Sequence, residues 1–490
     1  MISRIPPELR AALSQGVGFS LLIKGAPGTG KTTLAFEILN EFGGENAIYL
    51  STRVSVPALY HQFPWVEERA DSLSVIDATK LYIPPTAVDE IRYYVPDEAY
   101  VKYKARLEAV KGFSGPYSLF NVLYEKVVDA EKPAALVVDS WEAITAEEKE
   151  MMIKLWKAAI NALAQIYSPE YRLNLILIAE TTDATPLDYL ADGILELNRI
   201  TLDYRRAREV VLKKLRGTRI DQHKYGFTLD GGRFRSFPPF ERRKVEKPRR
   251  VEIVPNTATH LSTGCVELDG ILDGGLRTGS TAMIEYGDDL SLLGYHSIIA
   301  QMIINSIQQG THCVKIPSSG WDERRLRRGI VPFVKEADYL NYLTVFEIRR
   351  EEQKETRENV KVLEGLSMDE DFPLFTEFVS HLEPPVMVII GTDWLEYQYR
   401  LKTLGNLEEA LEAFAYWIME LREAGNVAVF GMPTGGVMGN GLGQMVTTHL
   451  NLTVLDRSVV LYCNRPDTKL HCLENVITED ALTLQLTPFV

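Results

Sequence analysis

The chain has 490 residues, of which 46% are hydrophobic and 24% are charged, and these proportions exclude a disordered or fibrous protein. Its length predicts two or three domains. The formal net charge of −14 argues against a protein that coats nucleic acid, so we expect no nucleic-acid partner.

The N-terminus lacks a secretory pattern, and apolar strings such as Leu175–Ala179 are too short to span a bilayer, which predicts a cytoplasmic protein without a membrane partner. The four cysteines lack C-x-x-C spacing, so we expect free, buried thiols.

The first half of the chain alternates short apolar strands with helices. The predicted helices span 32–42 and 146–166, and the predicted strands span 19–24, 47–50, 74–76, 134–138, 175–179 and 193–197. Continuous apolar strands that alternate with helices are typical of a parallel sheet covered on both faces. A long polar stretch at 80–120 is interpreted as an insertion.

The second half repeats this plan. Its predicted strands span 281–285, 311–316, 386–390 and 427–430, and its predicted helices span 295–309 and 407–423. Residues 46–53 can be overlaid on 312–319, and residues 135–141 on 387–393, which favours an internal repeat of a whole domain. A chance likeness between two unrelated α/β domains is the alternative. A polar segment at 350–372 is interpreted as a second insertion.

A basic, proline-containing segment separates the two halves. Residues 241–250 hold six basic and two acidic side chains, a net charge of +4. We therefore predict a first domain at 1–240, a basic linker at 241–258 and a second domain at 259–490. Besides a solvated linker, the segment can be interpreted as a docking site for an acidic partner.

Residues Gly25-Ala-Pro-Gly-Thr-Gly-Lys-Thr32 fit the phosphate-binding pattern G-x-x-x-x-G-K-[ST] in full, between a predicted strand and a predicted helix. Glycines let backbone N–H groups close around phosphate oxygens, and the N-terminus of the following helix favours the same anion. Lys31 is expected to reach the β- and γ-phosphates of ATP, and Thr32 is expected to hold Mg²⁺ through its hydroxyl group. The predicted nucleotide-binding residues are Gly25, Ala26, Pro27, Gly28, Thr29, Gly30, Lys31, Thr32 and Thr33.

A second Mg²⁺ ligand is predicted at Asp139, which follows the apolar run Ala134–Val138. An acidic residue at the carboxyl end of a buried strand lies beside the phosphate-binding loop in parallel α/β folds. Thr32 and Asp139 together therefore predict a site for ATP with Mg²⁺.

Three features of the first half together resemble the KaiC branch of the RecA ATPase superfamily. They are the phosphate-binding loop, the strand before Asp139, and the run Leu212-Lys-Lys-Leu-Arg-Gly217. In the second half, the segment from Ser262-Thr-Gly264 to Gly279 is similar to the opening segment of that family's domains. The resemblance implies an α/β fold with two tandem RecA-like P-loop NTPase domains.

Shorter strings in the first half are similar to the archaeal gas-vesicle regulator GvpD and its relatives. These strings are Ser20–Gly25, Tyr49–Val54 and Gln62–Trp65. The resemblance implies a regulator that combines a P-loop with arginine-rich regions and acts through a transcription activator. The basic runs at 242–250 and 324–328 fit this composition.

The sequence departs from the KaiC pattern at the residue that orients the attacking water. KaiC-like ATPases place a glutamate just after the second strand, where this chain has Ser51-Thr52-Arg53. Glu142 and Glu180 are the available catalytic replacements, although both also suit ordinary strand ends, and the resemblance places Glu180 at the γ-phosphate sensor. We expect slow hydrolysis, because loss of a positioning group usually lowers a rate by orders of magnitude.

Lys214 and Arg216 match the K-x-R pair with which KaiC-like rings reach the γ-phosphate of a neighbouring subunit. A cationic pair supplied in this way neutralises charge during phosphoryl transfer. The resemblance therefore implies either a homo-oligomer or a site completed by the second domain of the same chain. A solvated, charged edge strand is the alternative.

The second half lacks this chemistry. Gly287–Ser297 stands where a P-loop would follow the strand, and it contains no lysine, while Asp288 and Asp289 would repel phosphate. Gly391 replaces the magnesium-binding aspartate. We therefore predict a degenerate domain that serves packing or partner binding.

The sequence favours a weak, ATP-dependent regulatory ATPase that acts as a switch for a protein partner. Two other functions stay open: a DNA-acting motor of the RecA type, and a scaffold that holds ATP without hydrolysing it. The acidic net charge argues against the motor, and the missing glutamate favours the scaffold over a fast ATPase. ATP is preferred to GTP because no guanine-reading N-K-x-D string occurs.

Overall fold

The computed structural model of the chain divides into two compact units, which are described separately. Unit 1 comprises Met1–Phe237 with Val490, and unit 2 comprises Pro238–Phe489. The structure describes residues 4–15, 18–44, 47–77, 135–140, 173–241, 245–287, 289–318, 321–348, 357–365, 367–399, 401, 407–477 and 482–490. Glu142, the predicted helix at 146–166 and the polar stretch at 80–120 lie outside the described residues.

A nine-stranded mixed sheet forms the centre of unit 1, in the order β3-β2-β4-β5-β1-β6-β7-β8-β9. The strands from β3 to β6 in this order run parallel, and β7, β8 and β9 continue the sheet antiparallel. The strands are β1 (Ser20–Lys24), β2 (Ala47–Ser51), β3 (Leu73–Asp77), β4 (Ala135–Asp139), β5 (Asn174–Ala179), β6 (Gly193–Leu202), β7 (Arg205–Leu215), β8 (Lys224–Thr228) and β9 (Arg235–Ser236). The helices are α1 (Pro7–Leu13), α2 (Lys31–Phe42), α3 (Val56–Gln62), α4 (Pro64–Glu67) and α9 (Pro186–Leu190).

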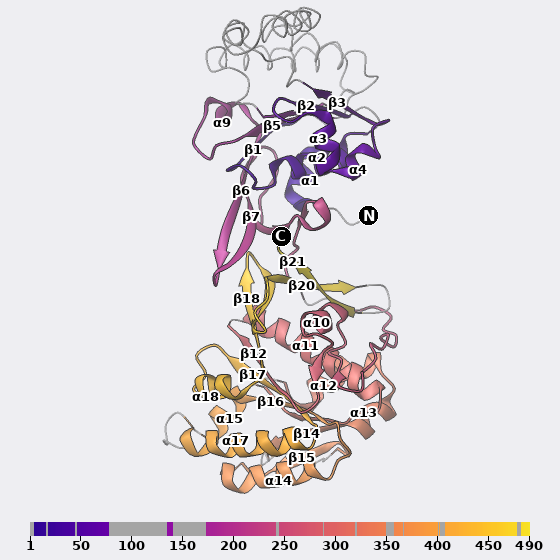
Figure 1. The fold of residues 1–490 in the computed structure, drawn as a ribbon, viewed down its shortest axis with the longest axis vertical. Coiled ribbons are helices and arrows are strands. Elements are labelled where there is room, and N and C mark those ends of the chain that lie inside the picture. The colour runs from indigo at the N-terminus through magenta and orange to yellow at the C-terminus, as the bar shows by residue number, and fades with distance from the viewer. Residues whose placement is uncertain are drawn as a thin grey trace, which may run out of the picture. The chain divides into compact units, whose positions relative to one another are not determined.

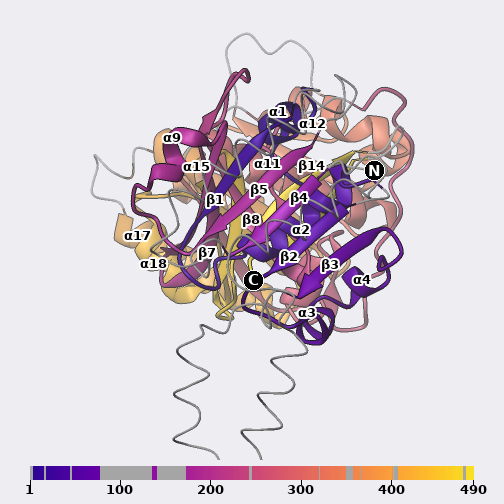
Figure 2. The same ribbon diagram turned by 90° about the horizontal axis from the view of Figure 1, so that it is seen from above.

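Helix α2 lies across the parallel strands of unit 1, as Figure 2 shows. Leu34 and Ile38 of α2 are fully buried in the same hydrophobic cluster as Leu21 and Ile23 of β1. Burial of these side chains fixes α2 relative to β1, and it therefore fixes both ends of the loop at 25–30 that joins them.

Unit 2 is built on a ten-stranded mixed sheet in the order β15-β14-β13-β16-β17-β12-β18-β19-β20-β21, with a separate two-stranded ribbon of β10 and β11. Its strands are β10 (His260–Leu261), β11 (Leu276–Arg277), β12 (Thr281–Tyr286), β13 (Cys313–Ile316), β14 (Leu343–Ile348), β15 (Val360–Leu363), β16 (Met387–Gly391), β17 (Val427–Pro433), β18 (Thr448–Leu455), β19 (Ser458–Arg465), β20 (His471–Ile477) and β21 (Leu482–Pro488). Its helices are α10 (Val266–Ile271), α11 (Asp289–Gln308), α12 (Glu323–Ile330), α13 (Glu336–Tyr342), α14 (Met368–Ser380), α15 (Thr392–Gln398), α17 (Leu407–Glu423) and α18 (Gly439–Met445).

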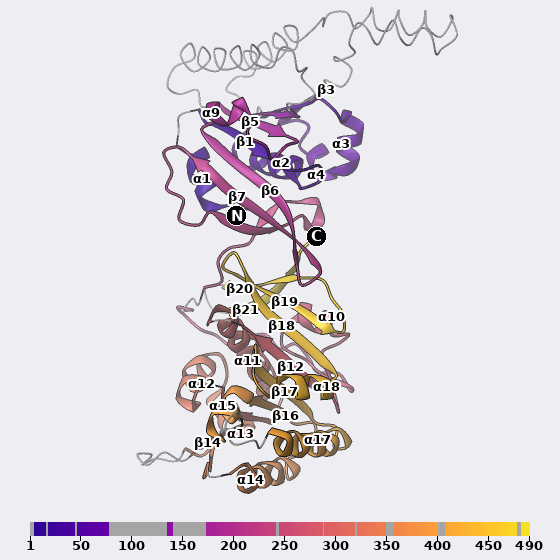
Figure 3. The same ribbon diagram turned by 90° about the vertical axis from the view of Figure 1, so that its left-hand side faces the viewer.

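Helices cover both faces of the sheet of unit 2. On one face, α11, α12 and α13 enclose a core that includes Ile284 of β12. On the other face, α14, α17 and α18 enclose a second core that includes Met283 of the same strand. Figure 1 labels both sets of helices within this unit, and Figure 3 shows α14 and α17 lying next to each other. Neighbouring residues of one strand point to opposite faces, so a strand between two helix layers is apolar throughout.

The two units repeat one topology, which confirms the predicted α/β fold with tandem P-loop NTPase-like domains. The order β3-β2-β4-β5-β1-β6-β7-β8 of unit 1 corresponds to β14-β13-β16-β17-β12-β18-β19-β20 of unit 2. The register also corresponds, because Tyr49 pairs with Val137 in unit 1 and Lys315 pairs with Ile389 in unit 2. These are the residues that the sequence overlay matches, so the likeness extends to individual positions.

Two segments differ from their sequence interpretation. The segment at 350–372, interpreted as an insertion, supplies strand β15 at the sheet edge and the start of α14. The second half of the predicted linker packs on unit 2, since Val251 is buried in its core and Val254 N donates a hydrogen bond to Asn305 Oδ1 of α11. Strand β15 has only four residues, so it is too short to give a clear periodic pattern in the sequence.

The cysteines and the longest apolar helix are also placed by the structure. Cys265, Cys313, Cys463 and Cys472 are free and buried, as predicted. Among the described residues, one helix has the length and hydropathy of a membrane span, over Leu290–Gln308 of α11, and 72% of that window is buried within the structure. Its apolar residues belong to the core of unit 2.

Candidate nucleotide-binding site

The P-loop (Gly25–Thr32) connects β1 to α2 at the carboxyl end of the parallel strands. Gly25 and Gly30 have φ values of 152° and 105°, which L-residues with a side chain rarely adopt. A Cβ atom at Gly25 would lie 2.6 Å from the carbonyl oxygen of Leu197 on β6, so the loop can pass beside β6 only with glycine there. Backbone N–H groups at the start of α2 are thus held at an open, anion-binding end of the helix.

Lys31 is buried, and its ammonium group is held by the loop itself. Its Nζ donates hydrogen bonds to the carbonyl oxygens of Gly25 and Ala26, both at 2.8 Å, and to Glu180 Oε2 at 2.9 Å. Glu180 follows β5, the strand that lies between β1 and β4. The structure therefore places Glu180 on the cation that is predicted to meet the phosphates.

Thr32 and Asp139, the two predicted Mg²⁺ ligands, are brought together. Thr32 Oγ1 donates a hydrogen bond of 2.6 Å to Asp139 Oδ2, and Tyr49 OH donates one of 2.5 Å to the same oxygen. Burial raises the pKa of the Asp139 carboxyl group, and the nearby Glu180 acts in the same direction, whereas the two hydroxyl groups and Lys31 oppose the rise. A hydroxyl group and a carboxylate side by side are the donor set that Mg²⁺ takes from a P-loop protein, so these residues fit the ion.

Tyr49 also belongs to the site, although no sequence pattern pointed to it. Burial and the adjacent Asp139 raise the pKa of its hydroxyl group well above the ordinary value, which keeps it a hydrogen-bond donor. The available signal was its position on β2, the strand that pairs with β4, two residues before the stretch that lacks the expected glutamate.

The Ser51-Thr52-Arg53 stretch is tied to the end of β4. Thr52 N donates a hydrogen bond of 2.7 Å to the carbonyl oxygen of Asp139, and Thr52 Oγ1 accepts one of 2.8 Å from Ser140 N. Ser51 Oγ donates to the carbonyl oxygen of Val54. These side chains hold backbone in place, and the stretch offers no carboxylate that could orient water.

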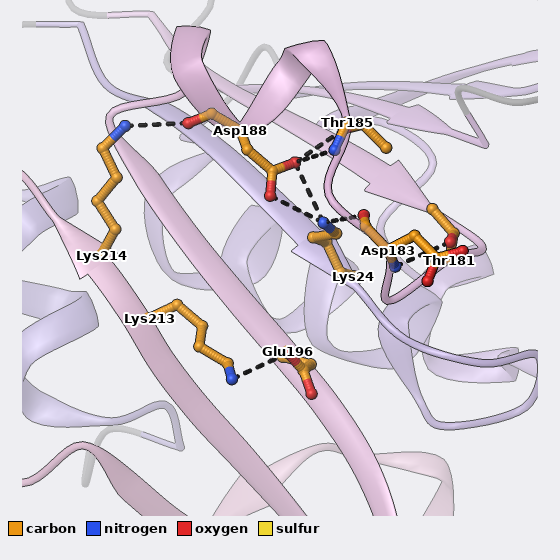
Figure 4. A network of polar contacts seen from close by, with 8 residues as sticks. All are labelled: Lys24, Thr181, Asp183, Thr185, Asp188, Glu196, Lys213 and Lys214. Atoms are coloured by element: carbon orange, nitrogen blue, oxygen red, sulfur yellow. Dashed lines mark hydrogen bonds and ion pairs between the residues drawn. The ribbon is translucent and has the colours of Figure 1, made fainter.

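Lys24, the residue directly before the P-loop, is the centre of a second polar network (Figure 4). Its Nζ donates hydrogen bonds to the carbonyl oxygen of Asp183 at 2.5 Å and to Asp188 Oδ1 and Oδ2 at 3.1 and 2.9 Å. Thr185 donates to Asp188 Oδ1 from its backbone N and from its hydroxyl group. Lys24 therefore ties β1 to the segment 180–192, the connection between β5 and β6 that begins with Glu180.

Lys214 and Arg216 contact the same connection within unit 1. Lys214 Nζ donates to the carbonyl oxygens of Asp188 and Ala191 at 3.1 and 2.6 Å, at the end of α9 (Figure 4). Arg216 Nη1 forms an ion pair of 3.2 Å with Asp192. The predicted contact of this pair with the γ-phosphate of a neighbour stays a prediction.

Unit 2 does not reproduce the P-loop. Only two residues separate β12 from α11, which begins at Asp289, whereas six residues separate β1 from α2. The overlay places Lys315 at the position of Tyr49 and Gly391 at the position of Asp139. Unit 2 thus keeps the sheet but lacks both the phosphate-binding loop and the aspartate.

Comparison with known proteins supports a P-loop domain in unit 1. Residues 9–215 match the family described as the P-loop domain of the GvpD gas vesicle protein. This part of the chain is similar to the P-loop domain of GvpD. The chain is 26% identical to Protein GvpD2 of Halobacterium salinarum over 357 residues, which cover 71% of this chain and 68% of that protein. It is 28% identical to Protein GvpD1 of the same organism over 351 residues, 70% of this chain and 61% of the relative.

The matched segment 9–215 contains the P-loop, Tyr49, Asp139, Glu180 and Lys214, and Arg216 lies one residue beyond it. The segment begins in α1 and ends at the last residue of β7. The comparisons therefore confirm the predicted resemblance to GvpD, and a P-loop domain of this kind implies nucleotide binding.

Proposed function

We propose that unit 1 binds ATP with Mg²⁺ and that the bound nucleotide acts as a regulatory switch read by a protein partner. The description of the family connects it with gas vesicles, and we extend to this chain a role in regulating gas vesicle formation. The partner is proposed to be a transcription regulator.

The ion pair between Lys31 and Glu180 is the observation that carries this proposal. The γ-phosphate of ATP and the Glu180 carboxylate are both anions that would compete for the Lys31 ammonium group. Bound ATP would therefore displace Glu180, and this residue begins the 180–192 connection that Lys24, Lys214 and Arg216 hold. A change at the phosphate site can thus reach β6 and β7 through a short, continuous network.

Hydrolysis is proposed to be slow. The Ser51-Thr52-Arg53 stretch places hydroxyl groups rather than a carboxylate beside Asp139. The same observation favours a second function, a scaffold that holds ATP without hydrolysing it. Turnover distinguishes the two.

Binding of Mg²⁺–ATP by calorimetry and steady-state turnover test the proposal. We expect Lys31→Ala to weaken ATP binding about tenfold or more, because it removes a charge-assisted contact to the phosphates. The matched control is Lys213→Ala, a lysine that pairs with Glu196 on the neighbouring strand and should leave binding unchanged. Equal ATP affinity of the wild type and Lys31→Ala would contradict nucleotide binding at this loop, and binding without turnover would favour the scaffold.

A further inference from the structure

Two arginines of the β6–β7 hairpin lie against the outer side of the P-loop. Arg199 Nη2 donates a hydrogen bond of 2.6 Å to the carbonyl oxygen of Gly28. Arg208 Nη1 donates to the carbonyl oxygens of Gly28 and Thr29, both at 3.2 Å. A Cβ atom at Gly28 would collide with the Arg199 guanidinium group, so glycine at this position is what permits the approach.

The positions of these two arginines bring like charges together, which is electrostatically unfavourable. Arg199 and Arg208 are direct cross-strand partners in the antiparallel pair of β6 and β7. Like charges directly opposite each other destabilise a sheet. Partial burial and then the charges of Arg199 and Arg206 lower the pKa of Arg208.

Among the described residues, no side-chain carboxylate forms an ion pair with Arg199, Arg206 or Arg208. Arg208 Nε donates a hydrogen bond of 2.5 Å to a main-chain oxygen of Val490. The P-loop carbonyl oxygens carry only partial charges. A nearby anion would therefore relieve the repulsion between the guanidinium groups.

The carbonyl groups that accept hydrogen bonds from the two arginines belong to the same peptide groups as N–H donors of the P-loop. The carbonyl of Gly28 shares its peptide group with the N–H of Thr29, and the carbonyl of Thr29 shares its peptide group with the N–H of Gly30. A cation bound to a carbonyl oxygen polarises the peptide group and makes its N–H a stronger donor. In a P-loop these N–H groups are the ones that cradle phosphate.

We propose that Arg199 and Arg208 are positioning residues for the nucleotide, which hold and polarise the Gly28–Gly30 peptides from the side opposite the phosphates. They act on the loop of their own unit and need no neighbouring subunit. This inference rests on the proposed nucleotide binding at the P-loop, and it adds a cationic pair that neither the P-loop pattern nor the K-x-R pair contains.

The experiment measures ATP and ADP affinity of the full chain for the wild type, Arg199→Gln and Arg208→Gln, with the unfolding temperature of each protein without nucleotide. Arg206→Gln is the matched control, because it removes the same charge from the same hairpin and Arg206 makes no hydrogen bond to the P-loop among the described contacts. We expect affinity to fall roughly five- to tenfold in the first two variants and less than about twofold in the control. The apparent KM should rise while kcat stays near the wild-type value, because the pair acts on the loop and not on the attacking water.

Arg199→Lys keeps the proposal testable if a glutamine variant does not fold. It retains a cation and one donor, so we expect it to bind ATP within about threefold of the wild type. Affinities of Arg199→Gln and Arg208→Gln equal to that of Arg206→Gln would overturn the inference and leave the proposed function intact. A lower unfolding temperature without any change in affinity would also overturn it, since the pair would then be purely structural. If the wild type itself does not bind nucleotide, both this inference and the proposed function are overturned.

Discussion

At the scale of single residues, the Glu180 carboxylate contacts the Lys31 ammonium group, to which the phosphates of ATP are proposed to bind. Glu180 Oε2 accepts a hydrogen bond from Lys31, and Tyr49 and Thr32 both donate to Asp139. The side chains of Lys31, Thr32 and Asp139 therefore all have hydrogen-bond partners within the site. A ligand must replace these contacts, and its net affinity is the difference between the new and the old ones.

Glu180→Gln tests this competition. Removing the carboxylate frees Lys31 from its counter-ion and takes a like charge away from the phosphates, so we expect ATP to bind about fivefold more tightly, close to 1 kcal/mol. Calorimetric titration with Mg²⁺–ATP measures the change, and Glu196→Gln, whose partner is Lys213, serves as the control. Weaker binding or a large loss of turnover in Glu180→Gln would instead make Glu180 a group that acts on the nucleotide or on water.

At the scale of elements, the connection between β5 and β6 is held from several sides. Lys24 of β1 binds Asp188, Lys214 of β7 binds the end of α9, and Arg216 pairs with Asp192. Helix α9 has only five residues, too few to be stable alone. The polar contacts from two strands therefore decide where it lies.

The pH dependence of stability tests the contact between Lys24 and Asp188. Burial opposes ionisation of Asp188, but the hydrogen bonds from Lys24 and Thr185 outweigh it, and the pKa of this carboxyl group lies below its ordinary value. The unfolded chain then binds more protons than the folded one as the pH falls below about 4, so the stability contributed by Asp188 is present above that pH and is lost under it.

Asp188→Asn should accordingly lower the free energy of unfolding of unit 1 at pH 7 by about 1 kcal/mol. The difference from the wild type should shrink as the pH falls through the acid range. Chemical denaturation followed by circular dichroism at several pH values measures it. Asp221→Asn, at an exposed ion pair with Arg219, is the control. A difference that does not depend on pH would show that Asp188 contributes through packing alone.

At the scale of the whole molecule, one topology serves two chemically different units. The register places Lys315 of β13 where unit 1 has Tyr49, and Lys315 is fully buried with no hydrogen-bond partner for Nζ among the described residues. Burial lowers the pKa of Lys315 to about 8, although the carboxylate of Asp393 opposes this effect. Unit 2 therefore keeps a buried charge at a position where unit 1 keeps a neutral hydroxyl group.

Lys315→Met tests this difference. The folded chain releases the Lys315 proton near pH 8 and the unfolded chain releases it near 10.5, so the unfolded state binds more protons between these values and stability rises with pH there. The free energy of unfolding of the wild type minus that of Lys315→Met should increase by about 3 kcal/mol between pH 7 and pH 11. Denaturant titrations of both proteins measure it, with the exposed Lys335→Met as the control. A constant difference across this range would contradict a buried, shifted amine.

The sequence by itself determined where the predicted strands of both units lie. Every described strand among those predicted begins within two residues of its expected position, because apolar runs and glycine-rich turns are local signals. The pattern at 25–32 and the strand before Asp139 also predicted which residues would bind phosphate and Mg²⁺, and the structure brings Thr32 and Asp139 within hydrogen-bonding distance. These assignments depend on residue types at fixed spacing, which a sequence carries directly.

The partners of the charged side chains were decided only by the tertiary structure. Lys24, Tyr49, Arg199 and Arg208 carry no motif, and the K-x-R pattern does not indicate the contacts of Lys214 with the end of α9. A lysine or arginine side chain can donate hydrogen bonds to many different carbonyl and carboxylate oxygens, so its residue type alone does not indicate its partner. Which partner it meets depends on how strands far apart in the sequence are aligned in the sheet, and that alignment is fixed by burial of the two faces and not by the charged residues themselves.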